Sequence, residues 1–151
     1  MKKFSIFIFL FLLMIFTACG ETNSVESPAN KDFNSKGFNM KIFINGKTFN
    51  ATLEDNESTR EFVKRLPLEI TMTELNGNEK YYKFSEQFPS NDRNVGTIHN
   101  GDLMLFNASY FVLFYKNFST NYSYTRLGRI DNVDDLENIV GTSNIKVRIE
   151  K

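Results

Sequence analysis

The stretch DLMLFNASYFVLFY, residues 102–115, contains two apolar and aromatic runs separated by a polar break. The runs cover residues 102–106 and 110–115, and Asn107-Ala108-Ser109 lies between them. Short continuous runs of this kind next to a turn are typical of strands that are buried on both faces. We therefore expect two neighbouring central strands that are joined by a tight connection.

Weaker signals on either side of this pair predict the other strands. Asn45-Gly46 separates residues 40–44 from residues 47–53, and an Asn-Gly pair tolerates the positive φ angles of a type I′ hairpin turn. Apolar and polar residues alternate over residues 68–72, which is typical of a half-buried strand. Further strands are expected over residues 80–84, 123–130 and 145–149. About eight short strands in one small domain are compatible with a sandwich or a closed barrel.

Two short helices are expected between the strands. The first follows Asp55 or Asn56 as its cap and extends to about residue 66, and Ser58 with Glu61 fits the pattern of a capping box. The second covers residues 134–140, and a glycine at position 141 ends it. The domain is thus predicted to be mainly β, with little helix.

Residues 1–19 predict where the protein is located. Two lysines precede an unbroken apolar run over residues 4–16, and Thr17-Ala18 precede Cys19. The run is shorter than the roughly 20 apolar residues of a spanning helix, and small residues before a lone cysteine are typical of a bacterial lipoprotein signal. We expect cleavage after residue 18, lipidation of Cys19, and an exported protein anchored to the bacterial membrane by acyl chains. The alternative is an uncleaved or conventionally cleaved export signal, which also places the protein outside the cytoplasm.

The rest of the chain divides into a tether and one domain. Residues 19–39 are rich in Ser, Asn, Glu and Lys, so we expect a flexible tether with a reach of about 25 Å. Residues 40–151 suffice for one domain with a single core. Without residues 1–18 the chain has 16 basic and 18 acidic residues and no basic stripe, which argues against nucleic-acid binding.

Four sequence blocks, taken in order, resemble the bacterial cyclophilin-like domain family. They are LPL at 66–68, NGNEKY at 76–81, GTIHNGDL at 96–103, and LFY at 113–115 continuing to SYTRLGRI at 123–130. The resemblance covers nearly all of residues 40–150 and implies a closed eight-stranded barrel with two capping helices. Members look like small stand-alone or lipoprotein domains whose role is largely undefined. Some are associated with flavodoxin-like proteins, which implies a flavodoxin-like envelope protein as a candidate partner.

The resemblance to true proline isomerases extends only to the fold. Their Phe-x-Arg segment and downstream Gln-Gly-Gly stretch have no counterpart in this sequence. Rotation of an X-Pro bond nevertheless requires no acid, base or metal, because a dry groove and one donor can lower its barrier of about 18–20 kcal/mol. A peptidyl-prolyl cis-trans isomerase of the envelope is therefore the alternative to a protein that only binds its ligand.

The tyrosines indicate a candidate ligand-binding surface. All six lie between residues 81 and 124, although the domain extends well beyond both positions. Tyr122, Tyr124 and Arg126 share one face of the expected strand, where aromatic rings beside a guanidinium suit a peptide, a ring or a carboxylate. The alternative interpretation is ordinary cross-strand packing. The predicted ligand-binding residues are Tyr81, Tyr115, Tyr122, Tyr124 and Arg126.

Other polar residues receive weaker interpretations. Arg129 is expected on the opposite face from Arg126, as a surface charge. Glu79 and Lys80 follow a turn and form either a solvated ion pair or the mouth of a groove.

No catalytic, metal-binding or cofactor-binding residue can be assigned. His99 lies three residues before Asp102, but no Gly-x-Ser-x-Gly nucleophile motif accompanies it, so we expect a histidine in a turn. One histidine and one lipidated cysteine do not supply the usual zinc ligands. No glycine-rich phosphate loop is present, and we predict no cofactor.

Overall fold

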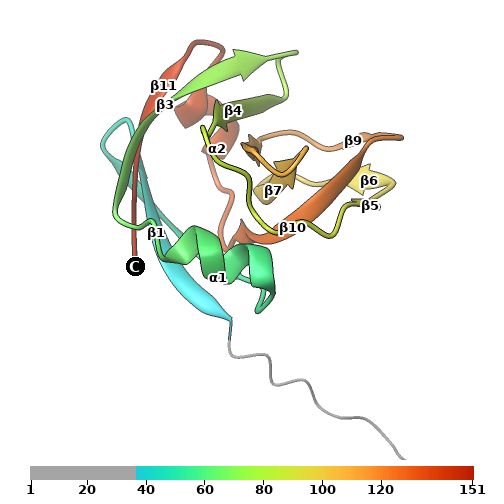
Figure 1. Ribbon diagram of the computed structural model, residues 1–151. Helices are drawn as coiled ribbons and strands as arrows, with labels where there is room; N and C mark the ends of the chain where they lie inside the picture. The colour runs from blue at the N-terminus through green and yellow to red at the C-terminus, as the bar shows by residue number, and fades with distance from the viewer. Residues whose placement is uncertain (1–36) are drawn as a thin grey trace, which may run out of the picture. The chain divides into compact units, whose positions relative to one another are not determined.

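The computed structural model describes residues 37–151, which form one closed antiparallel β-barrel (Figure 1). Eight strands pair in the order β2-β1-β11-β3-β4-β8-β7-β10, and pairing of β10 with β2 closes the barrel. The barrel strands are β1 (Phe38–Ile44), β2 (Lys47–Leu53), β3 (Leu68–Leu75), β4 (Glu79–Lys83), β7 (Asp102–Phe106), β8 (Tyr110–Phe114), β10 (Ser123–Ile130) and β11 (Ile145–Glu150). The expected closed barrel of eight strands is confirmed, and the sandwich is excluded.

The turns agree with the chemistry of their residues. Asn45 and Gly46 have φ angles of 48° and 80°, and Ile44 pairs with Lys47 across the turn, so the predicted tight hairpin is present. Asn76 and Gly77 also have positive φ angles, of 57° and 70°, in the three-residue connection between β3 and β4, where Leu75 pairs with Glu79. The hairpin extends further than expected, because β1 begins two residues before position 40.

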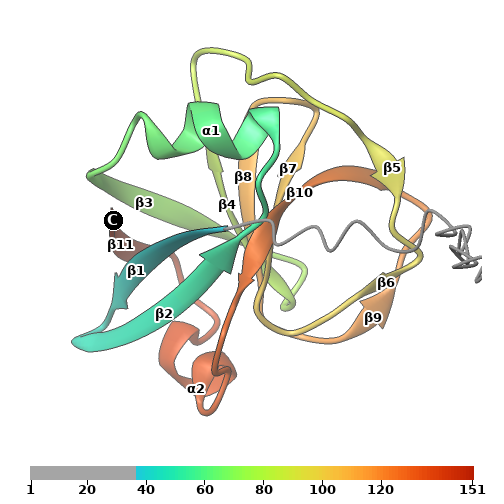
Figure 2. The same ribbon diagram turned by 90° about the horizontal axis from the view of Figure 1, so that it is seen from below.

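Strands β7 and β8 are buried on both faces, as their continuous apolar runs predicted. Leu103, Leu105 and Phe111 point into the barrel and belong to the main core. Met104 and Val112 point outward into a second apolar cluster. Three short strands, β5 (Arg93–Asn94), β6 (Thr97–Ile98) and β9 (Phe118–Ser119), lie outside the barrel beside β10 (Figure 2). Ile98 of β6 and Phe118 of β9 pack in this outer cluster.

The two helices, α1 (Glu57–Val63) and α2 (Leu136–Val140), lie at opposite ends of the barrel (Figure 1). In α1, Phe62 is fully buried and its ring packs against Phe84, Phe88 and Phe111, with centroid distances from 4.9 to 6.4 Å. In α2, the buried side chains are the first and last of the helix. The helices therefore close the core that the strands surround.

The caps of the helices only partly follow the prediction. Asn56 caps α1 by accepting a hydrogen bond from the Thr59 backbone N–H at 2.9 Å. The expected capping box is wrong, because the Ser58 hydroxyl donates to the Pro89 carbonyl instead. Gly141 ends α2 as predicted and donates its N–H to the Glu137 carbonyl.

The described helices do not include a membrane span, since none within residues 37–151 has the length and apolar character to cross a bilayer. The expected signal over residues 1–18, the lipidation site Cys19 and nearly all of the expected tether lie outside the described residues.

Candidate functional site

A groove lined by aromatic residues lies on the outer face of strands β4, β8, β7 and β10. Side chains alternate along each strand, so this face receives Tyr81 from β4, Tyr110 from β8, Phe106 from β7 and Tyr124 from β10. We call it the aromatic groove, with a volume of about 410 Å³. It is lined by Leu75, Asn76, Glu79, Tyr81, Phe106, Asn107, Tyr110, Val112, Tyr122 and Tyr124.

The rings of the groove form one connected cluster. Phe106 lies at its centre, with ring centroids 6.3 Å from Tyr110, 5.9 Å from Tyr122 and 5.4 Å from Tyr124. Tyr81 extends the cluster, since its centroid is 5.9 Å from that of Tyr110. These separations are those of offset or edge-to-face contacts, which hold the rings in place.

The groove also exposes apolar surface to solvent. Leu75 is 40% exposed and Tyr122 is 65% exposed, and they are the large hydrophobic residues with high exposure within residues 37–151. Both line the same groove. Scattered exposed apolar residues need no explanation, but their coincidence in one concavity is typical of a binding surface.

Glu79 is the charged residue of the aromatic groove. It is half-buried, and its carboxylate makes no hydrogen bond or ion pair with another residue in the described part of the chain. Burial, together with the nearby negative charge of Glu74, raises the pKa of Glu79 to about 7. An adjoining hollow of about 520 Å³ shares Glu79, Tyr122 and Tyr124 with the groove. The buried Oδ1 of Asn78, which also lines this hollow, has no hydrogen-bond partner among the described residues.

Lys80 lies on the opposite face of β4 from Glu79 and is fully buried inside the barrel. Its Nζ forms an ion pair with Glu74 and donates to the carbonyls of Gly141 and Ser143 at 2.7 and 2.8 Å. The predicted solvated pair of Glu79 and Lys80 is therefore wrong, because the pleat of the strand sends the two side chains to different environments.

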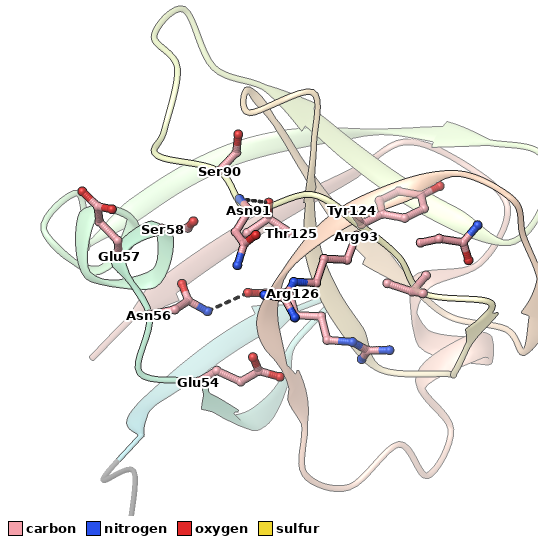
Figure 3. Close-up of a pocket in the computed structure, with 12 residues that line it drawn as sticks. Glu54, Asn56, Glu57, Ser58, Ser90, Asn91, Arg93, Tyr124, Thr125 and Arg126 are labelled. Carbon is pink, nitrogen blue, oxygen red and sulfur yellow. Dashed lines mark hydrogen bonds between the residues drawn. The ribbon is translucent and has the colours of Figure 1, made fainter. Parts of the chain in front are cut away.

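A second cavity, the polar cleft, has a volume of about 590 Å³ and lies between the start of α1 and the β5–β10 edge (Figure 3). Its charged lining residues are Glu54, Glu57, Arg93 and Arg126. In Figure 3 both arginines lie between Asn56 and Tyr124. Asn56 fixes the backbone at this point, because its amide donates to the Arg126 carbonyl at 2.9 Å.

Thr125 attaches the loop before β5 to β10. The Asn91 N–H donates to the Thr125 hydroxyl at 2.8 Å, and that hydroxyl donates to the Asp92 carboxylate at 2.5 Å. This loop supplies Ser90, Asn91 and Arg93 to the wall of the polar cleft. The cleft therefore has hydrogen-bonded walls on both sides.

A bulge in β10 determines where its arginines point. Arg126 pairs with Met104, Gly128 with Leu103 and Arg129 with Asp102, so one extra residue separates the two arginines. Both arginines therefore share the outer face, and the expectation that Arg129 points the opposite way from Arg126 is wrong. Gly128 permits the close approach to β2, since a Cβ there would lie 2.2 Å from the Thr52 carbonyl oxygen.

Asp102 is the anion that the arginines of β10 share. Its side chain is buried, and its carboxylate lies 3.9 Å from both the Arg126 and the Arg129 guanidinium. The His99 backbone N–H also donates to it at 2.9 Å, which places His99 in the predicted turn. Arg126 keeps 39% of its side chain exposed, so the guanidinium remains accessible from the polar cleft.

The structure brings four of the five predicted ligand-binding residues to these two cavities. Tyr81, Tyr122 and Tyr124 line the aromatic groove, Arg126 lines the polar cleft, and Tyr124 lines both. Tyr115 is not part of either cavity. It lies inside the barrel, where its hydroxyl donates to the Glu74 carboxylate with O–O distances of 2.9 Å.

Sequence reasoning missed several lining residues. Phe106 and Tyr110 share the outer face with Met104 and Val112, and strand periodicity could have grouped them. Arg93 carried no comparable signal, because it lies in a two-residue strand within a stretch that is irregular in sequence.

Comparison with known proteins agrees with this architecture. The solution structure of a hypothetical protein from Archaeoglobus fulgidus matches with a TM-score of 0.54 and 18% sequence identity, covering 76% of this chain and 94% of that chain. At this identity the match shows a shared fold. Comparison with curated proteins finds no match. The model of the cyclophilin-like family matches residues 42–150. The chain therefore belongs to the cyclophilin-like family.

Proposed function

We propose that the protein is a cell-envelope lipoprotein whose barrel binds a peptide or small ligand across the aromatic groove and the polar cleft. The observation that carries this proposal is the coincidence of exposed Leu75 and Tyr122 with the aromatic cluster in one groove. The two cavities, of about 410 and 590 Å³, have the size of typical ligand sites.

An extended peptide fits the distribution of chemistry better than a compact molecule does. The aromatic groove offers ring faces and one carboxylate, whereas the polar cleft offers two guanidinium groups and two carboxylates. Because Tyr124 lines both cavities, one chain can place an apolar side chain in the groove and an acidic group near Arg126. No assembled acid, base and nucleophile accompanies these cavities in residues 37–151, so binding alone is the simpler activity.

The proposal is tested by titrating peptide libraries into the full-length protein and its variants. Tyr122→Ala and Arg126→Ala are each expected to weaken binding about tenfold, since residues of these types commonly dominate binding energy. Tyr122 is preferable to the buried Tyr124, because its removal leaves the core intact. Arg148→Ala is the matched control, since 43% of the Arg148 side chain is exposed, on β11 outside both cavities. Unchanged affinity in both site variants would refute the proposal.

Proline isomerisation is the alternative activity at the same place. It is favoured by the Arg126 guanidinium, a donor whose side chain is 39% exposed in a cleft that Val95 and Tyr124 also line. A protease-coupled assay with a proline peptide distinguishes the two functions. An isomerase must accelerate the reaction and lose most of this acceleration in Arg126→Ala, whereas a protein that only binds gives the same rate in both forms.

The location in the envelope requires its own test. We expect the wild-type protein to incorporate labelled palmitate and to partition with membranes, and Cys19→Ser to do neither. A flavodoxin-like envelope protein remains the proposed partner, and co-purification from detergent-solubilised membranes is the corresponding measurement. These experiments are independent of the ligand-binding titrations.

A further inference from the structure

Glu79 occupies a position where no other residue within 37–151 balances its charge. It is the first residue of β4, paired with Leu75 of β3 and Phe114 of β8, and these neighbours supply no donor. Among residues 37–151, no lysine or arginine lines either the aromatic groove or the adjoining hollow. The adjacent Lys80 cannot serve, because it is buried on the other face of β4 with Glu74.

Such a carboxylate is unfavourable for folding. Removing a carboxylate from water without a compensating partner destabilises the native state, and a glutamine or threonine at this position would avoid the penalty. Groups that remain in this condition inside a concavity are enriched at functional sites. The position of Glu79 is therefore more easily explained by a ligand than by the stability of the barrel.

The surrounding aromatic rings favour a positively charged ligand, as the Glu79 carboxylate does. Aromatic faces carry negative partial charge and attract ammonium and guanidinium groups. The cluster already does so within the chain, since the Lys83 Nζ lies 5.4 Å from the centroid of the Tyr110 ring. The part of the groove beside Tyr122, Tyr124 and Glu79 has both the ring faces and the carboxylate, but its lining among the described residues includes no cation.

We infer that the aromatic groove binds a lysine side chain of an extended peptide, with its ammonium group against the Glu79 carboxylate and its methylene stem along Leu75 and Tyr122. This inference rests on the proposed peptide-binding function and names its chemistry. A lysine fits because its stem covers apolar surface while its charged end meets an anion. A peptide, rather than a free amine, fits because the polar cleft provides further charged contacts beyond Tyr124.

The test uses degenerate hexapeptides with blocked ends, in which one position is fixed either as lysine or as its neutral analogue norleucine. The full-length protein is immobilised at pH 8, and bound peptides are quantified by mass spectrometry. We expect about tenfold enrichment of the lysine set, which corresponds to one strong charge contact. Glu79→Gln should abolish the enrichment, and Glu69→Gln should retain it, because Glu69 is an exposed residue of β3 outside the groove.

Each other outcome refutes a defined part of the inference. Equal binding of the two peptide sets, or enrichment that survives in Glu79→Gln, would refute lysine recognition while leaving peptide binding in place. Binding of neither set would refute the proposed peptide-binding function itself. Free butylammonium that competes as well as the lysine peptides would show that the groove recognises a small amine rather than a peptide.

Discussion

Glu79 and Lys80 are neighbours on one strand, yet they have opposite surroundings. Lys80 points into the barrel, where its ammonium meets one carboxylate and two carbonyl oxygens. Glu79 points into the aromatic groove and has no charged or hydrogen-bonded partner among the described residues. A satisfied buried charge is consistent with a structural role, whereas a charge without a partner in a concavity indicates a place for a ligand.

The interior network is completed from several elements. Glu74 accepts from Lys80, from the Tyr115 hydroxyl and from the Gly77 N–H. Burial alone would raise the pKa of Glu74, but these hydrogen bonds outweigh it and lower the pKa. Burial and the contact with Glu74 raise the pKa of Tyr115, so this hydroxyl remains a donor at all physiological pH values. The charged groups of this network, Glu74 and Lys80, are therefore already paired within the described part of the chain, and the network does not need a ligand to balance them.

The largest expected effect comes from removing the interior cation. Lys80→Met leaves the Glu74 carboxylate without its ion pair, and breaking a buried pair destabilises a protein by about 3–5 kcal/mol. Urea unfolding measures this loss, and Lys83→Met on the exposed side of the same strand is the control. A loss below about 1 kcal/mol would mean that the two environments of β4 are less different than their contacts indicate.

A smaller effect is expected from Tyr115→Phe, which removes one donor to Glu74 and retains the ring. Loss of a hydrogen bond to a charged group destabilises by about 1.5–3 kcal/mol. Peptide binding should not change, because Tyr115 lies inside the barrel and lines neither cavity. Parallel unfolding and binding measurements test both statements. A binding defect without a stability defect would contradict the structural role of Tyr115 inside the barrel.

Glu79→Gln is expected to change stability in the opposite direction. The folded protein holds the Glu79 proton with a pKa of about 7, against an ordinary value of 4.5, so ionisation destabilises the fold as pH rises between these values. The glutamine variant should equal the wild type below pH 4.5 and should be more stable above pH 7, by about 1–2 kcal/mol after allowance for partial exposure. Urea unfolding across this pH range measures the effect, with Glu69→Gln as the charge-matched control. If the difference in unfolding free energy between Glu79→Gln and the wild type does not change with pH, the prediction is wrong.

The smallest expected effect on stability belongs to Tyr122→Ala. The residue is 65% exposed, so the free energy of unfolding should change by no more than about 0.5 kcal/mol. Ligand affinity should nevertheless fall, which would separate binding from folding at this position. A large loss of stability would indicate that Tyr122 acts as a packing residue through its contact with Phe106.

Much of the barrel was predictable from local patterns. Asn45-Gly46 and Asn76-Gly77 supply positive φ angles at two turns, and this requirement is readable from residue type alone. The continuous runs of β7 and β8 predicted burial on both faces, and the structure covers both. The clustering of tyrosines in the sequence drew attention to Tyr81, Tyr122 and Tyr124, which line one groove, and also to Tyr115, which does not.

The sequence did not predict correctly which face of a strand every side chain occupies. Tyr115 is the last residue of a run that is apolar on both faces, so the pattern could not say whether its ring points into the barrel or into the groove. Arg129 lies on the same face as Arg126, and not on the expected opposite face, because β10 contains a bulge between them. The bulge lies where Gly128 lets the strand approach β2. The strands that pair with β10 around this bulge are β2 and β7, and both are separated from it in the sequence, so the residues of β10 alone do not show the bulge.

The sequence by itself determined the strands, their turns and the aromatic character of one region, because these depend on residue type and on periodicity over a few positions. Only the tertiary structure decided that Lys80 is enclosed and satisfied while Glu79 is left facing a groove. The physical reason is that the inward or outward direction of each side chain in β4 is set by its register with β3 and β8. Hydrogen bonding across the closed barrel establishes that register, and no local pattern contains it.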